Sequence, residues 1–350
     1  MNESIKRSSM LDWISAGTAL WFVFGAYIDA RAHILVPELE TFFTPWHFVF
    51  YSGGMAILGV TLVSTWLHYR SGFDKENGSL LTFWKATPPG YGGVLPGGFI
   101  FFLSGIGDLL WHEAFGLEVG IEPLLSPTHL GLAIGGGMMV LGPYRAALTS
   151  KVAGLQDQLD WPALISITMV FSMVVFFLQY TIPLAGGFAW IFTGETDHSQ
   201  SFGAAKMVIH TSVLLGFLIH LDQRWMLRRN MGLGMMLFHG ALISLIMIGN
   251  QPSMVFWTFE GFSKLLAEGR IVLLSCLITG VIIDLSQRIV RQKGLSPYLA
   301  VVGGSWVSSM FFAVWILSDV EIGWGISGWM GVMTSTAILG WLAGLMVDQK

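Results

Sequence analysis

The chain has 350 residues, of which 53% are hydrophobic and 11% are charged, and its net charge is −4. Average soluble domains carry roughly 25% charged residues, so this composition excludes an ordinary soluble domain and predicts a membrane protein. No basic tract is present, which argues against a nucleic-acid partner. The single cysteine, Cys276, excludes a disulfide framework within the chain.

Apolar stretches long enough to cross about 30 Å of hydrocarbon recur from one end of the sequence to the other. The N-terminal stretch lacks a small-residue cleavage site, so we interpret it as a membrane helix and not as a removable signal. The segment 251–270 mixes aromatic and charged residues, and we expect it either to span the membrane or to lie on its surface. The sequence thus predicts an all-α polytopic bundle of about ten transmembrane helices, at 10–30, 45–68, 94–113, 126–148, 161–183, 203–222, 232–251, 268–287, 297–317 and 324–347.

The distribution of Lys and Arg predicts the orientation of these helices. With the N-terminus in the cytoplasm, fourteen of the 18 basic residues fall on the inner side and four on the outer side, as the positive-inside rule requires. Both termini are then cytoplasmic. We expect a multi-pass protein of the cell (inner) membrane.

A helix hairpin with the same polar pattern occurs twice in the first part of the chain. The first copy runs from Asp29-Ala-Arg-Ala-His33 through an acidic loop to Thr44-Pro45-Trp46-His47. The second runs from Asp108-Leu-Leu-Trp-His112 through another acidic loop to Ser126-Pro127-Thr128-His129. Residues four apart share one helix face at about 5–6 Å, so the aspartate and histidine of each copy can point at one ion.

The second helix of each hairpin begins in the same way. Thr44 and Ser126 are good N-caps, and proline follows each of them at the first helical position. This predicts His47 and His129 at the third helical residue, next to the aspartate–histidine pair of the same copy.

Pairs of glycines extend the likeness between the two copies. Gly53-Gly54 follow His47 by six and seven residues, and Gly135-Gly136 follow His129 by the same spacing. Glycines at these places allow membrane helices to approach closely. We therefore predict a parallel repeat of two hairpins about an axis along the membrane normal, with a metal-binding core at 1–150 and additional transmembrane helices of unknown function at 151–350.

Six ionisable side chains occupy matched positions near the outer membrane face. Burial of such groups at membrane depth costs free energy and usually marks a functional site, so the pattern favours a metal site. Two histidines and one carboxylate with open coordination positions suit non-haem iron(II), and imidazoles equally suit copper and zinc. A proton relay or a structural ion-pair cluster is the alternative. The predicted ligands of one or two ions are Asp29, His33, His47, Asp108, His112 and His129.

Asp108, Trp111-His112 and the Ser126-Pro127-Thr128-His129 run resemble the C subunit of the particulate methane and ammonia monooxygenases, the copper membrane monooxygenases. The resemblance covers about 29–54 and 104–137. It implies two copper-binding triads and oxidation of small apolar substrates by dioxygen. One of that family's triads starts with asparagine, whereas both start with aspartate in this chain, so the combined site is more anionic.

Further polar residues are candidates to hydrogen-bond to free ring nitrogens of the ligands. The alternative for the loop acids among them is that they are solvated surface residues with no role at the site. The candidates are Glu38, Glu118, Glu122, Glu195, His198 and His210.

Three functions follow from the same residues. The leading hypothesis is a metal-dependent oxygenase, an oxidoreductase that acts on a small apolar or lipid-like substrate with copper or iron. The alternatives are a transporter of metal ions or small solutes and a zinc-dependent intramembrane lipid hydrolase. We expect the protein to contact membrane lipids and to assemble either with copies of itself or with other membrane subunits.

Overall fold

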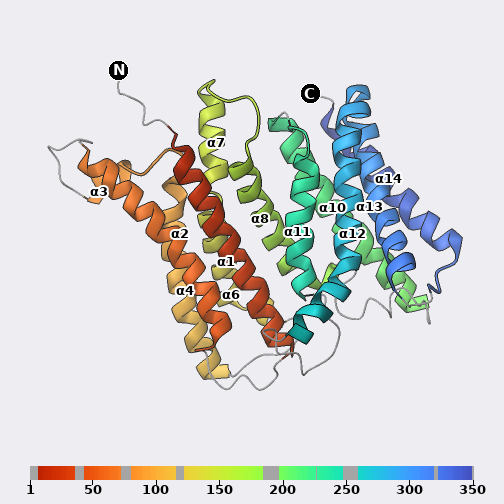
Figure 1. Cartoon of the computed structure of the whole chain (residues 1–350), viewed down its shortest axis with the longest axis horizontal. Coiled ribbons are helices and arrows are strands. Elements are labelled where there is room, and N and C mark those ends of the chain that lie inside the picture. The colour runs from red at the N-terminus through yellow and green to blue at the C-terminus, as the bar shows by residue number, and fades with distance from the viewer. Residues whose placement is uncertain are drawn as a thin grey trace. The chain divides into compact units, whose positions relative to one another are not determined.

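The computed structural model describes residues 7–35, 43–71, 80–115, 122–183, 197–225, 227–246, 259–318 and 322–348. Every regular element within these residues is a helix, and none of them forms a strand (Figure 1). The chain divides into two compact units, Met1–Met173 and Val174–Lys350.

Two long helix hairpins form the body of the first unit. In one, α1 (Ser9–Leu35) packs along α2 (Pro45–Arg70); in the other, α4 (Val94–Phe115) packs along α6 (Pro127–Val140). The remaining elements are α3 (Leu80–Lys85), η2 (Tyr91–Gly93), α5 (Glu122–Leu125), α7 (Gly142–Val152) and most of α8 (Trp161–Phe177).

The second unit is a bundle in which α11 packs on α12, α12 on α13 and α13 on α14. Its charged contacts lie near helix ends, where Arg291 donates two hydrogen bonds to Asp222 at 2.8 and 2.9 Å. This hydrogen bonding raises the pKa of Arg291 above its ordinary value. The elements are η3 (Gln179–Thr181), α10 (Asp197–Arg224), α11 (Met231–Ile246), α12 (Phe259–Ile289), η4 (Arg291–Lys293), α13 (Leu295–Leu317) and α14 (Ile326–Val347).

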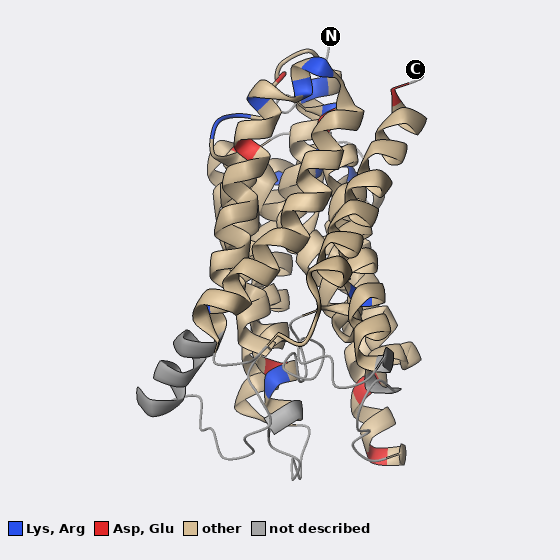
Figure 2. Ribbon diagram, turned by 90° about the vertical axis from the view of Figure 1, so that its right-hand side faces the viewer, with Lys and Arg blue, Asp and Glu red and all other residues tan. Residues whose placement is uncertain are grey.

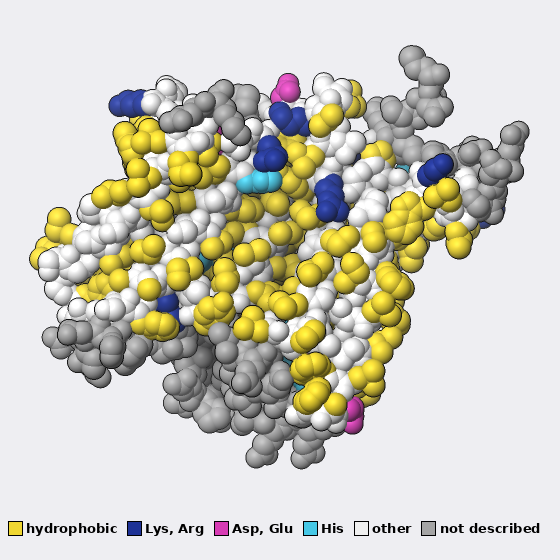
Figure 3. Space-filling model, turned by 180° about the vertical axis from the view of Figure 1, so that it is seen from behind, with side chains coloured by type: hydrophobic (Ala, Val, Ile, Leu, Met, Phe, Trp, Pro, Cys, Tyr) yellow, Lys and Arg dark blue, Asp and Glu magenta, His cyan; other side chains and the backbone are white. Residues whose placement is uncertain are grey.

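The length and composition of the helices define a multi-pass membrane protein. Charged residues are rare along the middle of the helices (Figure 2), and hydrophobic side chains cover much of the surface seen in Figure 3. Seven of the described helices are long and apolar enough to cross a membrane: Ser9–His33, Pro45–Arg70, Tyr91–Phe115, Ser199–Arg224, Gly269–Ile289, Leu295–Leu317 and Ile326–Val347.

The other three predicted spans differ from these seven. The helices at 161–183 and 232–251 are shorter in the described residues, where they run Trp161–Phe177 and Met231–Ile246. The span at 126–148 is divided at Leu141 into α6 and α7. Pro143 explains the division, because it has no N–H for the carbonyl four residues earlier and its ring would collide with that carbonyl.

The ambiguous segment 251–270 is described from Phe259 onward. There it is helical and continuous with the span at 268–287, so α12 begins nine residues earlier than that predicted span. The part at 251–258 lies outside the described residues.

Glycine brings the two helices of each hairpin into backbone contact. A Cβ atom at Gly53 would lie 2.6 Å from Cα of Phe22, and one at Gly135 would lie 2.5 Å from the backbone nitrogen of Phe101. Phe22 and Phe101 each precede the aspartate of their hairpin by seven residues. Any larger residue at either glycine would therefore push the two ligand-bearing helices apart.

The same phenylalanines also join the two hairpins. A Cβ at Gly54 would lie 2.9 Å from the ring of Phe101, and one at Gly136 would lie 2.7 Å from the ring of Phe22. The two rings meet edge to face with their centroids 5.3 Å apart. The Phe101 ring of the second hairpin thus packs against Gly54 of the first, and the Phe22 ring of the first hairpin packs against Gly136 of the second.

An ion-pair network stabilises the end of the first unit at which α1 begins. Arg7 contacts both Asp12 and Asp160 at 2.6 Å, and the Tyr91 hydroxyl donates to Asp12 at 2.7 Å. Asp12 is only 1% exposed. The network ties the start of α1 to η2 and to the segment before α8.

α8 packs with the hairpins, so the first compact unit reaches beyond residue 150. The Tyr27 hydroxyl donates to the carbonyl of Ser172 at 2.8 Å. The Ser166 hydroxyl donates to the carbonyl of Val140 at 2.7 Å. These contacts place most of α8 in the unit that ends at Met173.

Candidate metal site

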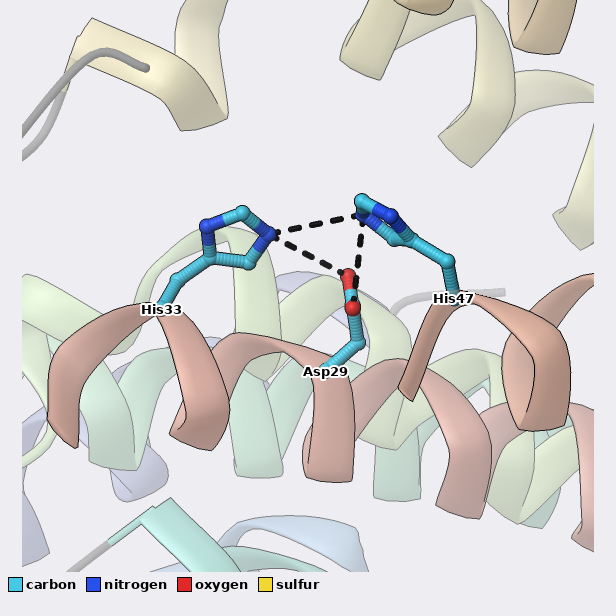
Figure 4. Close-up of side chains that lie close together, drawn as sticks. All are labelled: Asp29, His33 and His47. Carbon is cyan, nitrogen blue, oxygen red and sulfur yellow. Dashed lines mark hydrogen bonds and ion pairs between the residues drawn. The ribbon is translucent and has the colours of Figure 1, made fainter. Parts of the chain in front are cut away.

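The first triad joins the end of α1 to the start of α2 (Figure 4). His47 Nε2 lies 3.4 Å from Asp29 Oδ1, and His33 Nε2 lies 3.8 Å from Asp29 Oδ2. The two imidazole Nε2 atoms are 3.5 Å apart. Ligands at about 2.1 Å from a tetrahedral ion are separated by about 3.4 Å, so small side-chain movements would close this triad around an ion.

The second triad joins the end of α4 to the start of α6. His112 Nε2 lies 3.7 Å from Asp108 Oδ1, and His129 Nδ1 lies 3.5 Å from the same oxygen. In both triads one ligand atom from each residue lies within 4.8 Å of the other two. All six predicted ligands are therefore brought together as two groups of three.

The N-caps position the second histidine of each triad as predicted. The hydroxyl of Thr44 accepts the N–H of His47, and the hydroxyl of Ser126 accepts the N–H of His129, both at 3.2 Å. Proline occupies the first turn of both helices. Local cap geometry therefore directs each imidazole back toward the carboxylate of the preceding helix.

The two triads lie beside each other in the first unit. The rings of His33 and His112 are nearly parallel, with an angle of 14° and centroids 6.4 Å apart. His33 and His129 keep 29% and 26% of their side chains exposed, so each triad has an open side. Two ions held here would be neighbours.

The carboxylates of the two triads have different surroundings. Asp108 accepts a hydrogen bond from Thr128 on Oδ1 at 3.2 Å and one from Tyr51 on Oδ2 at 3.4 Å. Asp29 Oδ1 is buried and accepts no hydrogen bond from the described residues. The Asp108 side chain is 2% exposed and that of Asp29 is 16% exposed. Asp108 is thus held more firmly than Asp29.

The sequence did not single out Tyr51, although a signal was present. Tyr51 follows His47 by four residues and so shares its helix face. Its partner Asp108 is 57 residues away on another helix, and only the fold shows that the two meet.

Most of the proposed partners of the ligands have no side chain among the described residues. Glu38, Glu118 and Glu195 lie outside the described residues, and Glu122 and His198 are described only as backbone in α5 and α10. His210 lies in the second unit, with its ring 6.0 Å from that of His239 and 5.4 Å from that of Trp306. A contact of these residues with the ligands stays a prediction.

Comparison with known proteins found no matching family model, no matching curated protein and no matching solved structure. The fold and the site therefore define the class: a multi-pass helical membrane protein with two adjacent triads that could each hold a metal ion.

Proposed function

We propose that the protein is a membrane-embedded, metal-dependent oxygenase that binds one or two copper or iron ions through Asp29, His33, His47, Asp108, His112 and His129. The observation that carries this proposal is the pairing of two Asp/His/His groups side by side in one unit. Each group supplies two nitrogens and one oxygen and keeps an open side, which is the donor set used by non-haem iron oxygenases and accepted by copper.

A bound redox-active ion would supply dioxygen activation. In the overall reaction one oxygen atom is inserted into a C–H bond of an apolar or lipid-like substrate. The other oxygen atom leaves as water, with two electrons and two protons from a separate two-electron reductant. The residues of this chain hold the ion, orient the carboxylates and place the site at the ends of apolar helices.

The likeness to the C subunit of the copper membrane monooxygenases supports copper over iron, and the matched glycine and phenylalanine contacts support a parallel repeat of the hairpins. We further propose that the triads face the outer side of the inner membrane, with both termini cytoplasmic. Arg7, one of the basic residues that the orientation places on the inner side, lies at the other end of the same unit, and this supports the proposed orientation.

Metal analysis combined with X-ray absorption at the copper and iron edges tests this function. Purified protein reconstituted with each metal should bind one or two ions per chain with nitrogen and oxygen ligands, and it should consume dioxygen when a reductant and an apolar substrate are supplied. The absence of any bound transition metal after reconstitution would overturn the proposal. Uptake of the ion into proteoliposomes would favour a transporter, and dioxygen-independent turnover with zinc would favour a hydrolase.

A further inference from the structure

An apolar cavity of about 260 Å³ lies between α2 and α4 in the first unit. One face of each helix lines it, and Tyr51 brings the one polar side-chain group into the lining. The side chains that matter most here are Tyr51, Met55 and Leu58 from α2 and Phe102, Ile106 and Leu109 from α4.

Glycines on α4 allow the side chains of α2 to lie against its backbone. A Cβ at Gly105 would be 2.9 Å from the Tyr51 ring, and one at Gly98 would be 2.7 Å from a methyl carbon of Leu58. Both glycines belong to the lining. The cavity is therefore bounded by a close contact between helices, with Tyr51 seated directly on α4.

Tyr51 connects this cavity to the second triad. It lies one helical turn from His47, its ring lines the cavity, and its hydroxyl donates to Asp108 Oδ2 at 3.4 Å. A helical turn rises about 5.4 Å, so the cavity begins very near the candidate ligands. One side chain thus contacts both the carboxylate and the apolar space.

Among the residues that the structure describes, the first triad has no counterpart of this arrangement. Ala133 stands four residues after His129, where Tyr51 stands after His47, and Trp46 occupies the place of Thr128 before the histidine. Neither can donate a hydroxyl to Asp29. The two triads are therefore distinguished by substitutions at equivalent positions of the two hairpins.

The volume and the mouth of the cavity indicate what it holds. A dry apolar cavity of about 150 Å³ binds benzene or xenon, whereas pockets for drug-sized ligands begin at about 300 Å³. Met55, Phe102 and Ile106 are 56%, 57% and 45% exposed on the apolar outer surface of the helices. The space suits a compact apolar molecule that arrives sideways from the hydrocarbon, and it is too small for a phospholipid.

We propose that the cavity between α2 and α4 binds a small apolar molecule taken laterally from the membrane, and that Tyr51 is a positioning residue that orients Asp108 beside it. The second triad is then the one that acts on the substrate, and the first triad holds an accessory ion. This inference rests on the proposed function for its catalytic part, whereas the binding part can be tested without metal.

Xenon binding to the metal-free, full-length protein tests the cavity. Xenon-pressurised crystals should show anomalous density between α2 and α4, and ¹²⁹Xe NMR gives the affinity in lipid nanodiscs. We expect Ile106→Trp, which fills the mouth, to weaken xenon binding at least tenfold. Leu103→Trp is the matched control, because Leu103 is also on α4, is 51% exposed and does not line the cavity.

The binding site would be overturned if Ile106→Trp and Leu103→Trp bound xenon with the same affinity. It would also be overturned if xenon density appeared only outside the space between α2 and α4. Met55→Trp fills the mouth from α2 and serves as a second variant should Ile106→Trp fail to fold. Because this experiment uses no metal, its result is independent of whether the triads bind an ion.

Tyr51→Phe tests the positioning role, since it keeps the ring and removes the hydroxyl. We expect unchanged xenon binding but an altered electron paramagnetic resonance or X-ray absorption signature from metal at the second triad. Tyr27→Phe is the control, because the Tyr27 hydroxyl bonds to the carbonyl of Ser172. A Tyr51→Phe spectrum that matches the control spectrum would overturn the role of Tyr51, whereas absence of metal from the unmodified protein would overturn the proposed function itself.

Discussion

The imidazole rings of His33 and His112 lie nearly parallel, with centroids 6.4 Å apart, although they belong to different hairpins. Each ring completes a triad with the aspartate one turn earlier on its own helix. The packing of one hairpin against the other, through contacts such as those of α2 with α4, therefore sets the spacing between two candidate ions.

Removal of one histidine should empty one triad. We expect His112→Ala to weaken binding at the second triad by more than about 100-fold, because changes to residues around metal ligands already cost 10–100-fold. Metal titration with spectroscopic assignment of the two sites measures this. His68→Ala, in the last turn of α2, is the control and should bind metal normally. Unchanged binding by His112→Ala would show that the second triad holds no ion.

Loss of the Thr128 hydroxyl should weaken the second triad without removing a ligand. Thr128→Val takes away the hydrogen bond to Asp108 Oδ1, and we expect metal affinity there to fall about 10–100-fold. Thr61→Val is a matched control, since Thr61 is buried in α2 and its hydroxyl donates to the carbonyl of Ile57, away from the triads. An equal effect of the two substitutions would mean that Thr128 acts through general stability alone.

A methyl group at Gly135 should separate α4 from α6. The Cβ of Gly135→Ala would lie 2.5 Å from the backbone of Phe101, so we expect a lower unfolding temperature in detergent and weaker metal binding, because His129 moves away from Asp108. Gly137→Ala is the control in the same helix, since no atom lies within 4 Å of its Cβ. It should be neutral or stabilising by up to about 1 kcal/mol, since alanine is the better helix former. Identical behaviour of the two variants would contradict the role assigned to Gly135.

The ion-pair network at the far end should affect stability and not the site. Arg7→Ala leaves Asp12 buried without its cation, and breaking a buried pair in this way costs about 3 kcal/mol. We expect a lower free energy of unfolding with unchanged metal affinity per folded molecule. Lys85→Ala alters an exposed basic residue and should shift stability by no more than about 0.5 kcal/mol. A change in metal affinity caused by Arg7→Ala would show that the two ends are coupled.

The ligands of the candidate site could be predicted from sequence because local geometry decides them. Asp29 and His33 share a helix face through their spacing, and Thr44 fixes where α2 begins. The hydrogen bond from Tyr51 to Asp108 joins positions 57 residues apart, and no local pattern predicts it. The cavity likewise depends on tertiary packing, since its walls come from α2, α4 and Met139 of α6, and its size depends on how closely these helices pack.

Seven of the described helices are long and apolar enough to match predicted spans, and one further predicted span is divided by the backbone chemistry of a single residue. Pro143 divides the stretch that was predicted as one span at 126–148, and its effect could have been predicted from the missing N–H. The extent of the first unit could not, because it depends on tertiary contacts such as the one between Tyr27 and Ser172.

The packing of Phe22 and Phe101 against glycines of the opposite hairpin bears on how the protein is synthesised and inserted. The first triad is complete once His47 has been synthesised, yet the glycine that receives the Phe22 ring, Gly136, emerges from the ribosome 89 residues later. During that interval the first hairpin carries all three ligands but lacks its packing partner. We therefore expect stable metal loading only after α6 has entered the membrane, which makes loading a late step of biosynthesis.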